Sequence, residues 1–497
     1  MRQLKNKLLL FTVIALAACN SDSSKTGNKT DKVTDLTVTT KSADAKASVQ
    51  EGLTYSDEGN FQKASVSFTK AIQQDSNLAI AYILRANVAN SPKEFADYLA
   101  KAKAHLDGAG DWEKMYYDYY ATFLNNDYNQ RLDIAQKMAD KFPDAARAHF
   151  DLGFTYQGGN QFDKSREQFN KAIELNPTWV GGYNALVNSY LFNDPKDFKK
   201  AEENALKVVQ LAPKSAEAEI ALGDVYRAQN DMQKASDAYT KAIALDPQGS
   251  AGYYKRGHTY SFAGKYDEAR KDYTQGGNYD SVKTNPMFNI ANTYVYAGDT
   301  KMANEYLMQT AEKEDASNES ADKKIATKLN CLNDCALIAF HTGDAAMLSK
   351  LVAMIQPLSD AQGNEVGTNE AKLTEKSNQQ YWQALTAAVA GKYDEAKKIA
   401  EEMKTTLDPI KDPTKLQGYE FIQGYISMKQ KNYPDAISHF EKSNPADMYN
   451  KYMLAMSNEM AGNKDKAGQL YKELAVYNFN DLGYALIRAE AVKKAGM

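Results

Sequence analysis

The chain is poor in the residue types that catalytic and metal sites use most. Its 497 residues include only 5 histidines and 3 cysteines, and no two histidines lie three or four positions apart. The His-Glu-x-x-His pattern of metalloproteases, the phosphate loop and the nucleophile elbow are all missing. The sequence therefore predicts no catalytic residues, no metal site and no cofactor. An enzyme would need a constellation assembled from distant parts of the chain.

The chain also lacks a basic excess and, after its first residues, a long apolar run. Its formal net charge is -4, which gives no footprint for nucleic acid. No later segment stays apolar over the ~20 residues that a membrane-spanning helix needs. No stretch alternates apolar and polar residues as a strand does, although the composition, with 32 tyrosines, is that of a folded protein. We therefore expect an all-α protein.

The N-terminus has the order of features found in secretory signals. Arg2, Lys5 and Lys7 come first, and residues 8–18 then form an apolar stretch too short to span a bilayer as a helix. The stretch ends in Leu-Ala-Ala-Cys at Cys19, which resembles the lipobox of bacterial lipoproteins. The resemblance implies a signal peptide over residues 1–18, lipidation of the Cys19 thiol, and anchoring without spanning. The alternative is an ordinary signal peptide with an incidental cysteine.

The next residues predict a spacer. Residues 20–44 are rich in Ser, Thr, Lys and Asp and contain no aromatic residue, so we expect residues 19–44 to form a disordered tether. Asn20 follows Cys19 in place of the Asp that retains lipoproteins in the inner membrane of some bacteria. The resemblance thus implies a place in the cell envelope, and we expect the outer membrane. The inner membrane is the alternative, because other lineages sort by different rules.

A short pattern recurs along the rest of the chain: a turn residue, a spacer, an aromatic residue, two polar residues and an alanine. Residues 59–64, 264–269 and 391–396 are full copies. Looser copies begin at Asn126, Asn160, Lys196, Asn230, Gly298, Gly343, Lys431 and Gly462, and a degenerate one lies near Lys93. The steps from 126 to 160, from 196 to 230, from 230 to 264 and from 264 to 298 are each 34 residues. Such a period with helical patterning is typical of a repeat of helix pairs.

The residues around these copies resemble the consensus of the tetratricopeptide repeat (TPR) family. One unit carries Leu152, Gly153, Tyr156, Ser165, Phe169, Ala172 and Pro177, and another carries Leu222, Gly223, Tyr226, Ala235, Tyr239, Ala242 and Pro247. Small residues let two helices approach, and aromatic rings fill the space between pairs. Gly or Asn ends the first helix in the left-handed conformation, and Pro stops the second. The resemblance implies an all-α, right-handed superhelical TPR solenoid of about twelve helix pairs.

The expected organisation follows from this ladder. We expect a TPR array over residues 45–328, a degenerate helix pair with a long loop over 329–376, and a second array with a capping helix over 377–497. The loop is predicted at residues 357–378, which are rich in Gly, Asn and charge, and it is a candidate boundary between two superhelical sections. Cys331 and Cys335 lie four apart on an expected helix, where a disulfide would distort the backbone. We interpret them as small buried residues.

In the TPR family, the first helix of each pair lines a concave groove through the second, fifth, ninth and twelfth repeat positions. Mapping these positions gives the candidate peptide-binding residues Arg147, Phe150, Phe154, Gln157, Asn184, Asn188, Asp224, Arg227, Tyr254, His258, Phe288 and Asn292. Amide side chains can pair with a peptide backbone, and aromatic rings supply apolar burial. The alternative is that rings such as Phe150, Phe154 and Phe288 pack against neighbouring helices and bind nothing.

These resemblances imply a membrane-tethered TPR scaffold or assembly factor of the cell envelope, and not an enzyme. Its expected partners are a protein or peptide segment in the groove and the membrane through the lipid anchor, with no nucleic acid. The alternative is a glycan- or nutrient-binding lipoprotein of the SusD-like kind. Such proteins bind through long insertions with aromatic platforms, whereas the insertion expected here, residues 357–378, contains no aromatic residue.

Overall fold

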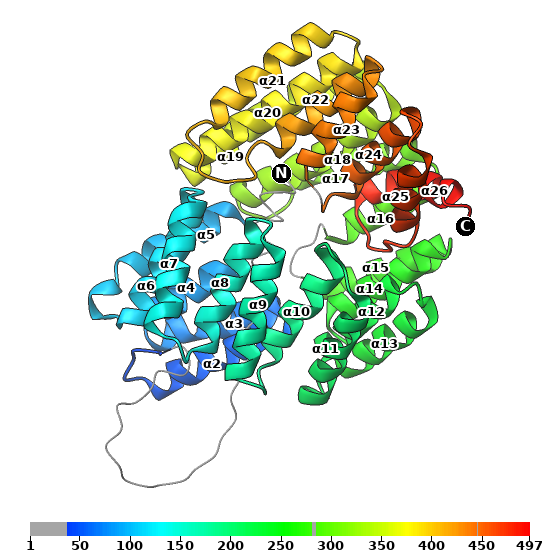
Figure 1. Cartoon of the computed structure of the whole chain (residues 1–497). Coiled ribbons are helices and arrows are strands. Elements are labelled where there is room, and N and C mark those ends of the chain that lie inside the picture. The colour runs from blue at the N-terminus through cyan, green and yellow to red at the C-terminus, as the bar shows by residue number, and fades with distance from the viewer. Residues whose placement is uncertain (1–36, 281–284, 445) are drawn as a thin grey trace. The chain divides into compact units, whose positions relative to one another are not determined.

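The computed structural model describes residues 37–280, 285–444 and 446–497, and it is built from helices (Figure 1). Within those residues there are 25 α-helices, one short 3-10 turn and no β-strand, which confirms the all-α prediction. In chain order the helices make twelve pairs and one final helix. Contacts divide the chain into two compact units, one ending at Val225 and the other spanning Tyr226–Met497. We call them the N-terminal unit and the C-terminal unit.

The N-terminal unit holds the first five helix pairs and most of α12, through which the boundary passes. Its helices are α2 (Ala43–Glu58), α3 (Phe61–Gln74), α4 (Ala79–Asn87), α5 (Pro92–Lys103), η1 (Leu106–Gly108), α6 (Asp111–Leu124), α7 (Tyr128–Lys141), α8 (Ala146–Gly158), α9 (Phe162–Leu175), α10 (Val180–Phe192), α11 (Phe198–Leu211) and α12 (Ala216–Ala228).

The C-terminal unit begins at the end of α12 and runs to the end of the chain. Its further helices are α13 (Met232–Leu245), α14 (Ser250–Phe262), α15 (Tyr266–Tyr279), α16 (Asn285–Tyr296), α17 (Thr300–Asp315), α18 (Ala321–Thr342), α19 (Ala345–Val366), α20 (Asn369–Val389), α21 (Tyr393–Leu407), α22 (Gln417–Lys429), α23 (Tyr433–Lys442), α24 (Met448–Met460), α25 (Lys464–Ala475) and α26 (Leu482–Lys494).

The first helix of most pairs ends where the repeat pattern predicts. Ten of the residues that begin a copy of the pattern have a positive φ: Gly59, Asn126, Asn160, Asn230, Gly264, Gly298, Gly343, Gly391, Lys431 and Gly462. A residue in this left-handed conformation turns the chain away from the helix axis, so the second helix can fold back on the first. Gly and Asn adopt it with the least strain, which explains why they dominate these positions.

Glycine inside the first helix brings the two helices of a pair together, as the sequence predicts. Gly153 of α8 faces Phe169 of α9 so closely that a Cβ atom at position 153 would lie 2.7 Å from the ring. Gly257 of α14 has the same relation to Tyr273 of α15, at 2.5 Å. Both rings are fully buried, so glycine at these positions makes room for the largest core side chains.

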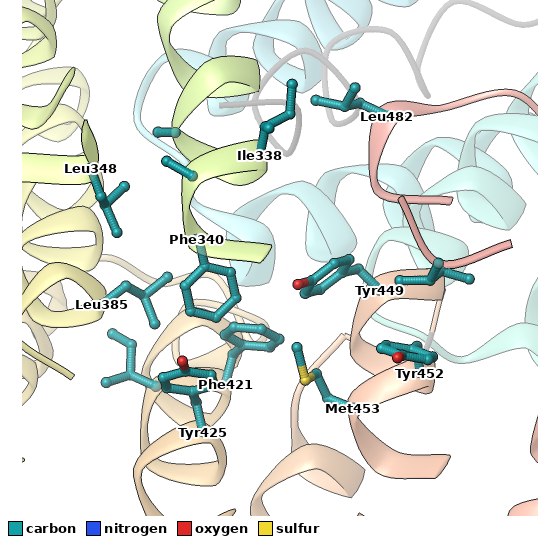
Figure 2. Packing of buried hydrophobic residues seen from close by; sticks show 14 of the residues in the cluster. Ile338, Phe340, Leu348, Leu385, Phe421, Tyr425, Tyr449, Tyr452, Met453 and Leu482 are labelled. Carbon is teal, nitrogen blue, oxygen red and sulfur yellow. The ribbon is translucent and has the colours of Figure 1, made fainter. Parts of the chain in front are cut away.

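The core of the C-terminal unit gathers helices from several pairs (Figure 2). The Phe340 ring of α18 lies 6.0 Å from Phe421 and 4.7 Å from Tyr425 of α22, measured between centroids. Leu482, at the start of α26, is fully buried in the same cluster. α26 contacts α16, α18 and α24 as well as α25. The final helix therefore packs back across the repeats, which is a wider role than the predicted cap at the end of the array.

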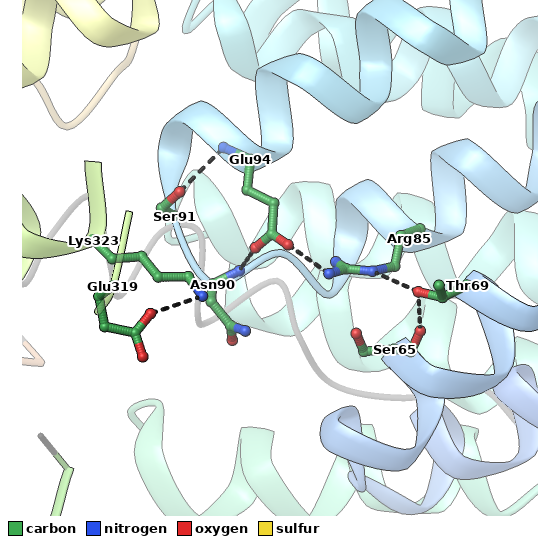
Figure 3. Close-up of polar contacts among 8 residues, drawn as sticks. All are labelled: Ser65, Thr69, Arg85, Asn90, Ser91, Glu94, Glu319 and Lys323. Carbon is green, nitrogen blue, oxygen red and sulfur yellow. Dashed lines mark hydrogen bonds and ion pairs between the residues drawn. The ribbon is translucent and has the colours of Figure 1, made fainter. Parts of the chain in front are cut away.

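A polar network organises the repeat whose pattern is degenerate near Lys93 (Figure 3). The buried Arg85 of α4 forms an ion pair with Glu94 of α5, and its Nε donates to Thr69 Oγ1 at 3.3 Å. Ser91 caps α5 by accepting from the Glu94 backbone N–H at 3.1 Å. Glu94 in turn accepts from the Asn90 backbone N–H at 2.6 Å. This capping arrangement starts α5 although the turn lacks the repeat's usual residues.

The long loop predicted at residues 357–378 is wrong, because α19 and α20 extend through almost all of it. Gly363 lies where α20 comes within 3.3 Å of its Cβ position, and Gly367 ends α19 in the left-handed conformation. Polar side chains join the two helices: Ser359 Oγ donates to Glu375 Oε2 at 2.7 Å, and Gln362 Nε2 donates to Glu375 Oε1 at 2.8 Å. The glycines and polar residues of this stretch therefore belong to two closely packed helices. A SusD-like protein would need a long insertion here, but these residues form part of that helix pair.

The last residues of the predicted tether are ordered. The Thr39 backbone N–H donates to Glu113 Oε1 at 2.9 Å, and α2 begins at Ala43, so the prediction of disorder up to residue 44 is wrong at its end. Two side chains of the folded body hold this stretch, and composition does not reveal such contacts. The predicted signal peptide, Cys19 and the rest of the tether lie outside the described residues. Among the helices that the structure describes, none is long and apolar enough to cross a membrane.

Candidate functional site

The twelve candidate groove residues lie on the first helices of their pairs, in α8, α10, α12, α14 and α16, and none of the twelve is exposed. Six are buried: Arg147, Phe150, Phe154, Asn184, Arg227 and Asn292. Six are partly buried: Gln157, Asn188, Asp224, Tyr254, His258 and Phe288. The chain itself therefore covers much of the predicted lining, and it does so differently in the two units.

We call the side of the first helices that carries the predicted groove residues the concave side. In the N-terminal unit these residues meet Asp57, near the end of α2. The Asp57 side chain is fully buried, with Oδ1 3.6 Å from Nη2 of Arg147 and Oδ2 accepting from Nε1 of Trp179 at 3.3 Å. Asn184 Nδ2 donates to the Asp57 backbone carbonyl at 3.3 Å. These contacts join the first pair to the fourth and fifth, and α2 accordingly packs on α10. Two predicted groove residues thus bind a residue of the same chain.

Aromatic rings fill the space beside this ion pair. Phe150 lies 4.9 Å from Trp179 and 4.6 Å from Phe154, measured between ring centroids. The Arg147 guanidinium lies 5.2 Å from the Trp179 ring, which allows a cation–π contact. The structure thus places Phe150 and Phe154 in intramolecular packing of the kind that the sequence left as their alternative role.

Asp151, one turn after Arg147 in α8, is a second buried carboxyl group. Its Oδ2 atom is buried and has no hydrogen-bond partner among the described residues. Burial raises the pKa of Asp151 to about 7, and the nearby Arg147 opposes that rise only in part. Burial also raises the pKa values of Tyr116 and Tyr119, which lie close by. Asp151 therefore keeps its proton to near neutral pH, whereas Asp57 faces the cation.

In the C-terminal unit, a non-helical segment of the chain lies on the concave side. We call residues 477–481, which join α25 to α26, the 477–481 segment. Asn478 is fully buried, and its Nδ2 donates to the Arg227 carbonyl at 3.3 Å and to Asn230 Oδ1 at 2.9 Å. The next residue, Phe479, places its ring 4.7 Å from the Arg227 guanidinium. These contacts fasten the segment to the end of α12.

The other end of the segment is held by α16. Asn480 Oδ1 accepts from Asn292 Nδ2 at 3.3 Å and from the Tyr296 hydroxyl at 3.0 Å. Its Nδ2 donates to Asn289 Oδ1 at 2.9 Å. Asn480 therefore uses both the donor and the acceptor of its side-chain amide. The groove amides were expected to pair with a peptide backbone, and here they pair with a side chain.

A hydrogen-bond chain connects the two ends of this contact. Arg227 Nη1 lies 3.0 Å from His258 Nδ1, and His258 Nε2 lies 3.3 Å from Asn289 Oδ1. A guanidinium can only donate, so His258 Nδ1 accepts and the ring proton lies on Nε2. His258 can then donate to the same Asn289 oxygen that accepts from Asn480. One chain of contacts thus links α12, α14 and α16 to the segment.

The remaining aromatic candidates are fixed by other contacts. The Tyr254 hydroxyl donates to Asp280 Oδ2 at 2.9 Å, and burial followed by the Asp280 charge raises the pKa of Tyr254. Phe288 packs against the hydrophobic cluster of the C-terminal unit. The structure therefore brings Arg227, His258 and Asn292 together around the 477–481 segment, and it employs Tyr254 and Phe288 elsewhere.

Several residues at these two sites were missed by sequence reasoning: Asp57, Trp179, Asn289, Tyr296, Asn478, Phe479 and Asn480. The sequence contains a signal that could have found some of these residues. Asn289 and Asn292 lie three apart inside a helix, where Asn is unfavourable and so suggests a specific contact. The run Asn478-Phe479-Asn480 lies between two expected helices. What the sequence does not reveal is that residues 191 positions apart, as Asn289 and Asn480 are, meet.

Metal-binding and thiol groups offer no competing site in the described part of the chain. No cluster of three or more His, Cys, Asp or Glu side chains there could hold a metal ion. Cys331 and Cys335 are both buried in the core of the C-terminal unit, which confirms their interpretation as small buried residues. Burial raises the pKa of the Cys335 thiol to about 12, so it is protonated at physiological pH.

Comparison with protein families finds repeats at several places along the chain. The tetratricopeptide repeat is matched by residues 45–86, 146–179 and 250–276, and a TPR repeat is matched by residues 223–261. The chain contains tetratricopeptide repeats. The matches fall on α2 to α4, on α8 and α9, and on α12 to α15. No curated protein matches the chain.

Solved structures of TPR proteins are similar to this chain. The Cut9–Hcn1 hetero-tetramer of the APC/C is 16% identical, with 86% of this chain and 75% of that chain covered and a TM-score of 0.40. MamA is 28% identical, with 35% and 96% covered and a TM-score of 0.28. YrrB, described as a TPR protein with an unusual peptide-binding site, is 18% identical, with 35% and 89% covered and a TM-score of 0.26. The prediction of helix pairs with tetratricopeptide repeats is confirmed by the described helices and by the family matches.

Proposed function

We propose that this protein is a lipid-anchored interaction scaffold of the bacterial cell envelope, which holds a segment of a partner protein on its concave side. Proteins built from TPR repeats generally bind protein or peptide partners and act as scaffolds. The observation that carries the proposal is the 477–481 segment, a non-helical stretch held by Arg227 of α12, by Asn230 just after α12 and by side chains of α16. A surface that holds such a segment within the chain has the donors and acceptors to hold one from another protein.

The two units support this role unequally. The concave side of the N-terminal unit is closed by the buried pair of Asp57 and Arg147, which is expensive to separate. The C-terminal unit holds its segment through neutral amides, a phenol and an aromatic ring. We therefore assign partner binding to the C-terminal unit and a structural role to the closed side of the N-terminal unit.

The anchor is proposed from the sequence around Cys19, and the outer membrane is the proposed location. The test is expression of the full chain in a bacterium supplied with labelled palmitate. The wild type should incorporate label and sediment with membranes, whereas Cys19→Ala should do neither. Label in the Cys19→Ala variant, or a wild type that is secreted unlabelled, would contradict the anchor. Separation of the two membranes then distinguishes outer from inner.

Partner binding is tested with the mature chain carrying Cys19→Ser, used as bait in detergent extracts of the envelope. A partner of the C-terminal unit should be lost with Asn289→Ala, because Asn289 carries the contact to Asn480. Asn170→Ala is the matched control, because Asn170 is exposed on α9, a second helix of its pair, and bonds only within its own helix. A protein recovered equally by all three baits, or none recovered at all, would contradict the proposal.

A further inference from the structure

The 477–481 segment is bound as a ligand would be, through three consecutive side chains. Asn478 reaches the end of α12, Phe479 lies against the Arg227 guanidinium, and Asn480 reaches α16. The receiving groups come from two first helices, α12 and α16, and from Asn230 just after α12. Arg227 is 1% exposed and Asn292 is 3% exposed, so two polar groups of the repeats are buried and directed at this segment. Buried polar groups placed in this way form a site with specific requirements for its occupant.

The contacts of this segment are of a kind that can be exchanged. Asn289 and Asn480 are only partly buried, so water can replace their mutual hydrogen bond when the segment leaves. Asn478 has a φ of 52°, in the left-handed region, so its backbone is under mild strain while docked. The two helices that flank the segment are held independently. α26 packs on α16, α18 and α24, and its residues Leu482 and Ile487 are fully buried in the hydrophobic cluster of this unit.

We propose that the concave side formed by α12, α14 and α16 is a binding site for a non-helical partner segment carrying Asn–aromatic–Asn, and that the 477–481 segment is its displaceable internal occupant. This inference rests on the proposed function and names the chemistry of the partner. The internal segment competes at the high effective concentration of a tethered ligand. A partner binds only by outcompeting it, so the site is closed until a matching segment arrives. α26 stays docked while the segment swings out.

The first test removes the competitor without touching the site. The variant with Asn478→Gly, Phe479→Ser and Asn480→Gly keeps the chain length but loses the three anchoring side chains. The probe is a fluorescent synthetic peptide with the sequence of residues 474–484, and binding is followed by anisotropy. The variant should bind the peptide saturably, with a Kd at least tenfold lower than that of the wild type. No saturable binding to the folded variant would overturn the proposal.

Two further substitutions in that variant test where the peptide binds. Asn292→Ala should weaken peptide binding tenfold or more, because Asn292 donates to the Asn480 position. Asn170→Ala is the matched control, an equal change at an exposed position of α9 outside the candidate groove residues, and it should leave the Kd within twofold. A peptide in which both asparagines are replaced by alanine should bind at least tenfold more weakly. Equal binding of the two peptides, or loss of binding with Asn170→Ala, would contradict the assigned site.

The second test uses the wild type and needs no variant to fold. Hydrogen exchange should be faster in the amides of residues 477–481 than in those of α25 and α26 on either side, because the segment opens without the helices. Exchange as slow as that of α26 would mean that the segment leaves only on unfolding, and the proposal would fail. Neither test uses an envelope partner, so failure here leaves the proposed scaffold role standing. Loss of the scaffold role would likewise leave these results unchanged.

Discussion

The concave sides of the two units are both filled by the chain's own residues, but with opposite chemistry. In the N-terminal unit the filling group is Asp57, a fully buried carboxylate that faces a buried guanidinium and an indole. In the C-terminal unit it is a run of amide and aromatic side chains, of which Asn478 and Phe479 are buried and Asn480 is partly open to water. A buried charge that loses its partner cannot regain water, whereas a partly exposed amide such as Asn480 can. The first closure is therefore permanent and the second is exchangeable.

This difference indicates where a partner can bind in a repeat protein whose groove is filled by the protein's own residues. The same helix positions line both concave sides, because the repeat dictates them. What differs is the solvent access and the charge of the group that fills each side. The predictions below test that contrast, from the largest expected effect to the smallest.

The largest effect is expected from Asp57→Ala. The substitution removes the carboxylate that faces Arg147 and accepts from Trp179, so a guanidinium is left buried without this counter-charge. The free energy of unfolding should fall by about 3–5 kcal/mol, measured by urea unfolding. Asp163→Ala, an exposed change on α9, should alter it by no more than about 0.5 kcal/mol. A loss below about 1 kcal/mol for Asp57→Ala would contradict the proposal that this side is permanently closed.

Asp151 makes the N-terminal unit sensitive to pH. Its pKa is raised to about 7 in the folded protein, above the ordinary 3.8, so the unfolded carboxyl group ionises first. The wild type should lose stability from about pH 4 to about pH 7, and Asp151→Asn should be spared this loss. The advantage of the variant should grow to about 4 kcal/mol, since one pKa unit corresponds to about 1.4 kcal/mol and the pKa is raised by about three units. Urea unfolding at pH 4, 5.5 and 7.5 measures it, and a constant difference would contradict the buried, protonated Asp151.

A smaller effect is expected from Asn480→Ala in the C-terminal unit. The change removes three hydrogen bonds, to Asn289, Asn292 and Tyr296, but water can reach part of this site. The free energy of unfolding should fall by about 1–2 kcal/mol in the same urea titration. A fall as large as that of Asp57→Ala would show that the two closures contribute equally to the free energy of unfolding. That result would contradict the proposed difference between them.

The smallest effect concerns the core of the C-terminal unit, which contains Cys335. Cys335 is buried, and its thiol pKa is raised to about 12, so a thiol reagent at pH 8 should label it only through unfolding. The labelling rate in the Gly-Ser-Gly variant of residues 478–480 should stay within a few-fold of the wild-type rate. Rapid labelling would mean that release of the segment loosens the whole C-terminal unit.

Much of the fold could be predicted because the repeat signals are local. A Gly or Asn that must take a positive φ, such as Gly59 or Asn230, marks the end of a first helix wherever it occurs. A glycine facing an aromatic residue, as in Gly153 and Phe169, records the approach of two adjacent helices. The same reasoning failed at residues 357–378, because a glycine that permits close packing looks the same as a glycine that permits a loop.

The candidate site was predicted only on its receiving side. Arg227, His258 and Asn292 follow from the repeat positions, but the segment that they hold lies near the other end of the C-terminal unit. Asp57 meets Trp179 across 122 positions for a similar reason. Such meetings depend on how successive pairs curve, and no short pattern encodes that curvature.

The sequence by itself determined the helix pairs, their breakpoints and the residues that face inward, because each depends on contacts between neighbours along the chain. Only the tertiary structure decided what fills the inward faces. Small rotations from pair to pair accumulate over several repeats and bring distant residues within hydrogen-bond distance. The burial that results turns one set of contacts into a locked ion pair and leaves another as a segment that water, or a partner, can replace.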